Sequence, residues 1–301
     1  MSVSPSHSSV ARGTSPQSLF GYEVIASIGE GAGSLIYAVR DPMTSQVYAL
    51  KHVLRHADKD IRYVQQVEAE YQVSKQFSHP GLRKSYDLKI KKTLLRKVTE
   101  AALVMELFDG QPMDVRPPSN CGSICDIFLQ TARALESMHH LGWIHCDLKP
   151  NNILLDQEWQ VKVIDFGQTC KSGTIKERIQ GTPDFIAPEQ VKCEGVTVRT
   201  DVFNFGATLY WALSGQKIPT LYTLKREQNS FLLDQKIPTP RDLNSSVPEG
   251  FSNLAMECVR TNPAKRPESM GEVARRLEVI QHSVSRLAKP AKPLPRAITF
   301  S

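Results

Sequence analysis

Three polar residues that could carry out chemistry on a phosphate lie close together in the segment 145–152. They are Asp147, Lys149 and Asn152. The Asp147 carboxylate can orient a hydroxyl nucleophile and accept its proton, and the Lys149 ammonium can neutralise charge on a transferring phosphoryl group. The Asn152 amide oxygen is a suitable ligand for a divalent cation. The segment therefore predicts phosphoryl transfer to a hydroxyl group.

A further carboxylate, Asp165, ends the apolar run Val161–Ile164 and is followed by Phe166 and Gly167. An acid at the end of a buried strand is well placed to hold Mg²⁺. Any one of these acids alone could belong to a turn. Their occurrence together, in this order, favours a metal-assisted active site.

Glycines 29, 31 and 33 lie between two β-like runs near the start of the chain. Because glycine has no Cβ, such a loop can approach phosphate oxygens closely, although hairpin turns also use glycine for shape alone. Lys51 follows within an apolar run, where its charge is costly unless it is matched. Glu70, on the next predicted helix, can match it. A purely structural ion pair is the alternative interpretation.

The order of predicted elements divides the chain into two unlike halves that meet near residue 108. β-like runs and one helical segment come first, and helical segments dominate afterwards. The predicted strands are 20–28, 35–40, 47–53 and two within 82–107, and the predicted helices are 61–77, 124–141, 201–214, 251–260 and 269–288. Residues 1–19 are Ser-rich and predict a disordered tail, and residues 286–301 predict a Pro-rich, basic tail.

Together these motifs resemble those of eukaryotic-like (Hanks-type) serine/threonine protein kinases, most closely the bacterial members. The resembling segments are Ile28–Ile36, Tyr48–Lys51, His145–Asn152, Asp165–Gly167 and Ala187–Glu189. The resemblance implies an α+β fold, the bilobal protein kinase fold. Its N-lobe (20–107) would hold an N-terminal five-stranded antiparallel sheet with one helix, and its C-lobe (108–285) would be mostly helical. ATP and Mg²⁺ (or Mn²⁺) are the implied cofactors, and proteins with Ser/Thr hydroxyls are the implied substrates.

The resemblance also assigns roles to individual residues. Asp147 matches the catalytic base, Lys149 the γ-phosphate contact and Thr182 the residue that bridges them, while Asn152 and Asp165 match the metal ligands. The residues at ATP-binding positions are Ile28, Gly29, Gly31, Gly33, Ser34, Ile36, Ala49, Lys51, Glu70, Met105, Glu106, Phe108 and Leu154.

Some of these assignments carry a more specific expectation. Glu70 is preferred to Glu68 as the partner of Lys51 because it lies ten residues before Pro80, the family's usual spacing. Met105 is expected to gate the nucleotide pocket, ahead of a linker whose backbone binds adenine. In the second half, Glu189 is expected to pair with Arg266, and Asp201 to brace the catalytic loop.

The position of Lys149 and the segment 181–189 favour serine/threonine over tyrosine as the phosphate acceptor. A pseudokinase, which would hold nucleotide as a binding scaffold without transferring phosphate, is the alternative function. The presence of Lys51, Asp147, Asn152 and Asp165 argues against it.

Three positions depart from the family pattern. Ser34 replaces the third glycine of the loop. Cys146 replaces the arginine that normally pairs with a phosphate on the activation segment, so we expect activity that does not depend on phosphorylation between residues 165 and 189. Ser74 stands where an apolar residue usually lies near Phe166, which indicates either a looser active state or a different helix register.

The six cysteines form no Cys-x-x-Cys pair, so neither a zinc site nor a redox dithiol is indicated by spacing. The Ser-rich N-terminus lacks the apolar core of a secretory signal, and no run of about 18 apolar residues indicates a membrane helix. We therefore expect reduced thiols and a cytoplasmic location. Cys146, beside the predicted base, and Cys170 suggest a redox switch; two unrelated small residues are the alternative.

The chain carries a net charge of +6. Residues 83–97 contain seven basic residues and one acid, and seven minus one is also +6. Such a segment can bind an acidic partner, anionic lipid or nucleic acid. A solvated basic hairpin without a partner is the alternative.

Overall fold

The computed structural model describes residues 16–31, 33–224 and 237–287. The chain divides into two compact units, one of residues 1–71 with 85–107 and one of residues 72–84 with 108–301. Most of the two predicted tails lies outside the described residues.

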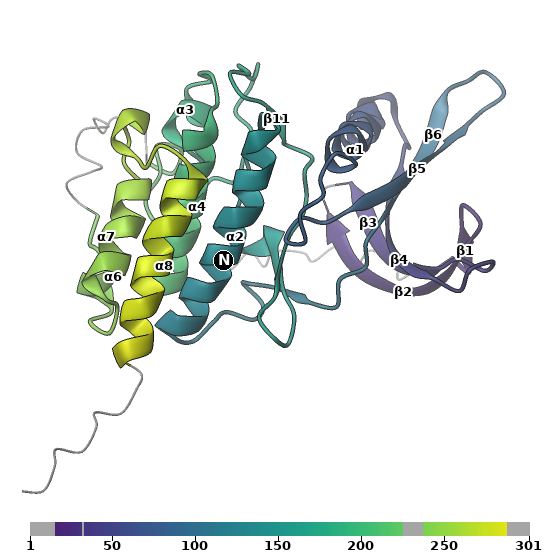
Figure 1. Ribbon diagram of the computed structural model, residues 1–301. Helices are drawn as coiled ribbons and strands as arrows, with labels where there is room; N and C mark the ends of the chain where they lie inside the picture. Colours follow the sequence, from purple (N-terminus) through teal and green to yellow (C-terminus); the bar gives the residue numbers. More distant parts are fainter. Residues whose placement is uncertain (1–15, 32, 225–236, 288–301) are drawn as a thin grey trace, which may run out of the picture. The chain divides into compact units, whose positions relative to one another are not determined.

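The first unit is built on one antiparallel sheet, drawn in purple and blue in Figure 1. Its strands follow the order β1-β2-β3-β4-β6-β5. Their bounds are Ser18–Leu19 (β1), Tyr22–Gly31 (β2), Ser34–Arg40 (β3), Val47–Leu54 (β4), Ser85–Lys92 (β5) and Val98–Met105 (β6).

The sheet has six strands rather than the predicted five because the chain reverses at Phe20 and Gly21. Both residues have positive φ, 52° and 87°. The reversal pairs Ser18 and Leu19 with Glu23 and Tyr22. The prediction of a disordered tail up to residue 19 is therefore wrong for these last two residues.

Helix α1 (Ile61–Ser74) follows a short 3₁₀ turn, η1 (Asp58–Asp60). Its buried residues Val64 and Val67 pack on side chains of β4 and β6, among them Ala49 and Leu103. The opposite face of the sheet has its own core, which includes Val39 and other side chains of β3, β4 and β6. Because successive strand residues point to opposite faces, β4 and β6 contribute to both cores.

The second unit is mostly helical, as predicted. Its helices are α2 (Cys121–His140), α3 (Pro188–Val191), α4 (Val198–Ser214), α6 (Pro240–Leu243), α7 (Glu249–Cys258) and α8 (Met270–Leu287), with short 3₁₀ turns η2 (Pro150–Asn152) and η3 (Pro263–Lys265). Helix α2 packs against α4 and α8 (Figure 1). The rings of Phe128 on α2 and Phe205 on α4 meet edge to face, 5.1 Å apart. None of the described helices is both long and apolar enough to cross a membrane.

Two small sheets hold the loops of this unit. One has the order β10-β9-β7, and the other pairs β8 with β11. Their bounds are Gln111–Pro112 (β7), Trp143–Ile144 (β8), Ile153–Leu155 (β9), Val161–Val163 (β10) and Cys170–Lys171 (β11). The predicted catalytic segment 145–152 thus runs between β8 and β9, so a strand fixes each of its ends.

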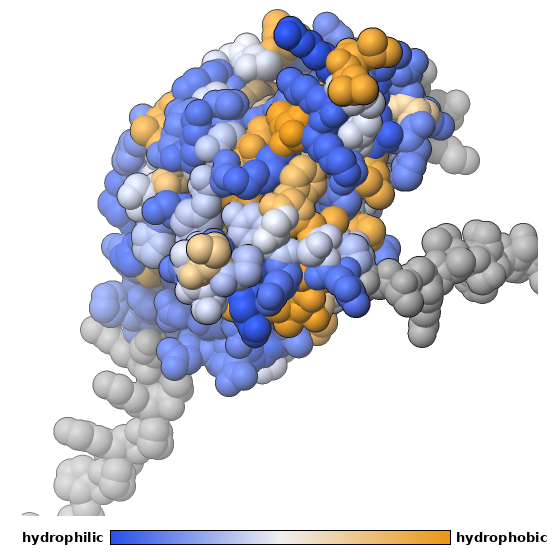
Figure 2. All heavy atoms as spheres, turned by 90° about the vertical axis from the view of Figure 1, so that its right-hand side faces the viewer, coloured by the Kyte–Doolittle hydropathy of each residue, from blue (hydrophilic) through white to orange (hydrophobic). Residues whose placement is uncertain are grey.

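The β5–β6 turn carries two leucines whose side chains are almost fully exposed. Leu94 and Leu95 have relative exposures of 103% and 84%. Figure 2 shows hydrophobic side chains, in orange, scattered among hydrophilic ones, in blue, on the face it presents. These two apolar side chains therefore stand at the tip of the turn among basic residues.

The contact between α4 and α7 depends on a glycine, which gives the first prediction. A Cβ on Gly206 would collide with Cys258 Cβ and lie 3.0 Å from Val259 Cγ1. We expect Gly206→Ala to lower the free energy of unfolding, measured by urea denaturation, by about 1–3 kcal/mol, because overpacking has a cost of this size.

Gly250→Ala on α7 is the matched control, since its Cβ would meet only Ile280 Cγ1 at 3.8 Å. There the helix propensity of alanine should leave stability unchanged or raise it by up to about 1 kcal/mol. Equal effects of the two changes would contradict this account.

Candidate active site

The catalytic segment is held by a buried carboxylate, Asp201, on α4. Its side chain has no exposed surface. The backbone N–H groups of His145 and Cys146 donate to Asp201 Oδ2 and Oδ1, both at 2.8 Å. His139 Nε2 on α2 donates to Oδ2 at 2.8 Å. The prediction that Asp201 braces the loop is confirmed by these contacts, and His139, which the sequence analysis did not single out, completes them.

The same contacts keep Asp201 charged. Burial alone would raise the pKa of this carboxyl. The hydrogen bond and charge of His139, together with nearby His145 and the Cys146 N–H, outweigh burial and hold its pKa below the usual range. A buried anion is tolerated when hydrogen bonds replace its water.

Asp147, Lys149 and Thr182 form a closed triangle of hydrogen bonds. Thr182 Oγ1 donates to Asp147 Oδ1 at 2.8 Å, and Lys149 Nζ donates to Asp147 Oδ2 at 3.1 Å. Lys149 Nζ also donates to Thr182 Oγ1 at 2.8 Å. The structure therefore brings together the three residues predicted to be catalytic, although Thr182 is 35 residues from Asp147 in the chain.

Asn152 contacts the backbone of Asp147. Its Nδ2 donates to the carbonyl oxygen of Asp147 at 2.9 Å, so the amide oxygen is the atom left for a cation. The N–H of Ile164 donates to the carbonyl of Asn152 at 3.0 Å, which ties this loop to the residue before Asp165. Asp165 has a φ of 64°, and an aspartate tolerates this left-handed conformation better than most residues.

Asn152 and Asp165 have the oxygen atoms that the predicted metal role requires, but they supply only two ligands. Within the described residues, no group of three or more His, Cys, Asp or Glu side chains could hold a metal ion. One carboxylate and one amide form an incomplete coordination shell. This matches Mg²⁺ sites, which usually combine one or two protein ligands with substrate phosphates and water.

Phe166 fixes the other side of this region. Its ring packs edge to face on Phe77 at 5.0 Å and on His145 at 5.7 Å. Phe77, three residues after Ser74, provides an apolar contact to Phe166. Ser74 is itself fully buried.

The activation segment is held to the catalytic loop by strand pairing and by the side chain of Gln190. β11 pairs with β8, with Cys170 opposite Ile144. Gln190 Nε2 donates to the carbonyl oxygens of Cys146 at 2.7 Å and of Gln180 at 3.1 Å. No pattern in the sequence points to Gln190, because it bonds to backbone carbonyls, which every residue carries.

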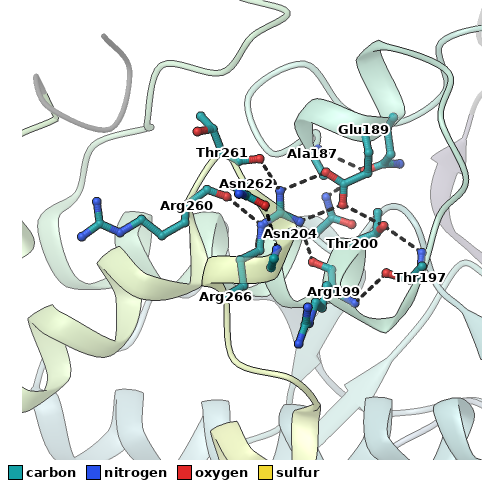
Figure 3. Close-up of polar contacts among 12 residues, drawn as sticks. Ala187, Glu189, Thr197, Arg199, Thr200, Asn204, Arg260, Thr261, Asn262 and Arg266 are labelled. Carbon is teal, nitrogen blue, oxygen red and sulfur yellow. Dashed lines mark hydrogen bonds and ion pairs between the residues drawn. The ribbon is translucent and has the colours of Figure 1, made fainter. Parts of the chain in front are cut away.

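The end of this segment is fixed by the ion pair between Glu189 and Arg266, as predicted (Figure 3). Arg266 Nη1 and Nη2 donate to Glu189 Oε1 and Oε2 at 2.7 and 2.9 Å. Thr200 Oγ1 donates to Glu189 Oε1 at 2.9 Å. Arg266 also donates to the carbonyls of Arg199, Arg260 and Thr261. Removing one partner of such a buried pair typically costs about 3–5 kcal/mol.

In the first unit, Lys51 on β4 and Glu70 on α1 form an ion pair of 2.7 Å, with side-chain exposures of 12% and 1%. The pair shows that Glu70, rather than Glu68, faces Lys51. Helix α1 therefore has the register expected from the family, in spite of Ser74.

The predicted nucleotide-binding residues of the first unit follow the sheet. Gly31 pairs with Ser34, and Gly29 with Ile36, across the β2–β3 hairpin. At its tip, Gly33 has a φ of 76°, and a Cβ there would lie 2.8 Å from the Tyr63 ring, so this position requires glycine.

The remaining predicted nucleotide contacts fall in both units. Ala49 pairs directly with Met105, and both are buried. Ile28 and Glu106 also belong to the first unit, whereas Phe108 and Leu154 belong to the second.

Comparison with known proteins agrees with this geometry. The family model for the protein kinase domain matches residues 22–282. The chain is 29% identical over 266 residues to the DNA damage-responsive serine/threonine-protein kinase RqkA of Deinococcus radiodurans, an alignment that covers 84% of this chain and 38% of that protein. It is 27% identical over 290 residues to the serine/threonine-protein kinase PknA of Mycobacterium tuberculosis, covering 92% of this chain and 66% of that protein.

The chain spans about two fifths of the length of several bacterial relatives, such as the 42% covered in a probable serine/threonine-protein kinase of Corynebacterium efficiens. The similarity is therefore to their kinase portion. With the family model matching most of its residues, this chain belongs to the protein kinase family, among relatives of the bacterial, Hanks-type serine/threonine kinases.

Proposed function

We propose that this chain transfers the γ-phosphoryl group of ATP to serine or threonine hydroxyls of protein substrates, with residues 20–107 and 108–285 as its two lobes. The observation that carries the proposal is the triangle of Asp147, Lys149 and Thr182. It presents a carboxylate and an ammonium together, which are the groups that hydroxyl activation and phosphate stabilisation require.

In this mechanism Asp147 accepts a hydrogen bond from the substrate hydroxyl, orients it and takes its proton as the bond to phosphorus forms. Lys149 neutralises charge on the transferred group. Thr182 holds both side chains in place and so couples the activation segment to the base. Asn152 and Asp165 would hold Mg²⁺ or Mn²⁺ with the nucleotide, and the bound ion would neutralise phosphate charge.

The pseudokinase alternative makes the opposite prediction about Asp147. We expect Asp147→Asn to lower the rate of phosphate transfer from labelled ATP to a generic acceptor protein by about 10²–10⁴-fold, the usual contribution of general-base catalysis. Asp126→Asn, an exposed residue on α2, is the matched control and should retain the wild-type rate. A wild-type chain that binds ATP but transfers no phosphate would instead support a scaffold function.

We also propose that activity does not depend on phosphorylation of the activation segment. Cys146 cannot pair with a phosphate as arginine does. The β8–β11 pairing and the Gln190 bonds hold the segment instead. Beyond β11, the Gly173 N–H donates to the Val196 carbonyl at 2.7 Å.

Phosphatase treatment tests this second proposal. We expect enzyme treated with phosphatase, and verified by mass spectrometry to carry no phosphate between residues 165 and 189, to keep at least about half of its initial rate. The phosphatase is removed before the assay. Near-complete loss of activity that returns on autophosphorylation would overturn the proposal.

A third proposal concerns the basic segment 83–97, for which we propose an acidic partner, specifically an anionic lipid surface. Three of the seven cations are buried or paired with acids. Arg83 is buried, Lys89 pairs with Asp87 at 2.6 Å and Lys91 with Glu100 at 2.9 Å. The exposed cations at the turn are Lys92, Arg96 and Lys97, which form no ion pair with any described residue.

The leucines favour lipid over nucleic acid as the partner. Leu94 and Leu95 stand between Lys92 and Arg96 and are exposed. Apolar side chains gain free energy by entering the acyl boundary of a membrane, where each basic residue near the surface adds about 1 kcal/mol. They gain little on a phosphate backbone. Reduced cysteines, all six of them unpaired in disulfides, support a cytoplasmic location for this contact.

Vesicle sedimentation tests this contact. We expect binding to vesicles containing phosphatidylglycerol, weakening with salt, and none to phosphatidylcholine alone. The triple variant Lys92→Gln, Arg96→Gln, Lys97→Gln should bind about 100-fold more weakly. A control with Lys192, Lys265 and Arg275 changed to glutamine, all exposed in the second unit, should bind normally. Tighter binding to duplex DNA than to the anionic vesicles, or equal losses in both variants, would contradict the proposal.

A further inference from the structure

Two cysteines from separate parts of the second unit face each other beside the predicted base. Cys146 directly precedes Asp147, and Cys170 lies in β11 at the start of the activation segment. Their Sγ atoms are 3.7 Å apart. All six cysteines are unoxidised, and no second pair of sulfur atoms is in hydrogen-bond contact among the described residues.

The two thiols have different surroundings. Cys146 is fully buried, whereas Cys170 is only partly buried. The hydrogen bond from Cys146 lowers the pKa of Cys170 to about 7, helped by the positive charge of Lys176 and a bond from Thr174, although burial opposes the change. The same hydrogen bond, with burial, raises the pKa of Cys146. The accessible sulfur is therefore the one that carries thiolate character.

We propose that Cys146 and Cys170 form a reversible intramolecular disulfide when the chain meets a hydroperoxide, and that this disulfide lowers transferase activity. The 3.7 Å contact is the observation behind the proposal. A disulfide requires sulfurs about 2.05 Å apart, so the two atoms must close by about 1.7 Å, which rotation of the side chains and a small shift of the loop can provide.

The first step oxidises Cys170. Its thiolate attacks one oxygen of hydrogen peroxide, the O–O bond breaks, and hydroxide leaves. Cys170 becomes a sulfenic acid, and its sulfur has lost two electrons to the peroxide. The partly buried position of Cys170 leaves it open to a small oxidant, whereas Cys125 and Cys258 are buried and burial raises the pKa of each thiol to about 12.

The second step forms the S–S bond. Cys146 loses its proton, attacks the Cys170 sulfur and displaces hydroxide, which takes up a proton to give water. Two thiols and one hydrogen peroxide thus yield one disulfide and two waters. Once Cys170 is no longer a thiolate, the chief cause of the raised Cys146 pKa is absent, so oxidation of the first sulfur prepares the second.

The expected effect on activity follows from the position of Cys146. Its N–H is held by Asp201 and its carbonyl by Gln190, and the next residue is the base. A movement of the Cys146 sulfur toward β11 would displace the Cys146 backbone and, with it, the adjacent Asp147. A misplacement of about 1 Å near reacting groups can lower a rate by about 10²-fold. This activity effect rests on the proposed function, whereas disulfide formation itself does not.

Simple packing is the competing explanation. Cys146 belongs to a small apolar cluster with Ile144 and Val196, and Cys170 lies against it. Two small side chains could meet there without chemistry. Packing alone predicts that peroxide leaves both thiols free.

The test treats the full-length chain with hydrogen peroxide, alkylates remaining thiols, and identifies peptides by mass spectrometry without reduction. We expect one linked pair, Cys146 with Cys170, two hydrogens lighter than the separate peptides, and a fall in transferase rate of about tenfold or more. Thiol reductant should restore both. In Cys146→Ser, Cys170 should accumulate as a sulfenic acid that dimedone traps.

Two variants make the result decisive. Cys170→Ser should keep the basal rate and resist peroxide, while Cys193→Ser, the matched control just beyond the end of the activation segment, should respond like wild type. Absence of the linked peptide would overturn the proposal. If the reduced chain is active and peroxide links the two peptides without changing the transferase rate, the proposed effect on activity is overturned. A chain inactive even when reduced, yet linked by peroxide, would contradict the proposed function and leave the disulfide standing.

Discussion

The fully buried Asp201 carboxylate is the constraint on which the catalytic loop depends. It binds the N–H groups of two consecutive residues, His145 and Cys146, and His139 provides a third donor. A buried carboxylate that lost these donors would be costly, so the loop backbone is fixed around it. Cys146 accordingly has a φ of 66°. The strain of such a conformation, about 1–3 kcal/mol, is offset by the bonds that it permits.

The position of Asp147 follows from this arrangement and from contacts on its other side. Asn152 binds its carbonyl, while Thr182 and Lys149 bind its carboxylate. Because Thr182 belongs to the activation segment, the geometry of the base depends on the order of that segment. The Glu189–Arg266 pair fixes the segment's end, so Asp147 is ordered through hydrogen bonds and ion pairs within the second unit.

Residues that share one short loop could be predicted from the sequence, because covalent spacing already limits where they lie. Asp147, Lys149 and Asn152 are of this kind. Lys51 was predictable for another reason, since a cation in an apolar strand requires a partner. The sequence suggested Cys146 and Cys170 together as a redox switch. It could not predict their contact, because the β8–β11 pairing that creates it involves two residues per strand and has no periodic pattern.

The sequence counts the charges of the basic segment 83–97 but does not show which of them are paired. Of the cations in 83–97, Arg83 is buried and Lys89 and Lys91 are paired with acids. What distinguishes the turn is the combination of three other exposed cations, Lys92, Arg96 and Lys97, with Leu94 and Leu95 at one tip.

The cysteine at position 146 bears on both the proposed phosphate independence and the proposed disulfide. The side chain there is fully buried, in contact with Ile144 and Val196. An arginine at this position would bring a buried cation that needs an anion such as a phosphate to compensate it. A small thiol needs none, so the segment can pack against the loop by apolar contact and backbone pairing. The same replacement puts a sulfur within 3.7 Å of Cys170. The absence of a cation that could pair with a phosphate and the presence of a thiol beside Cys170 are therefore consequences of one residue.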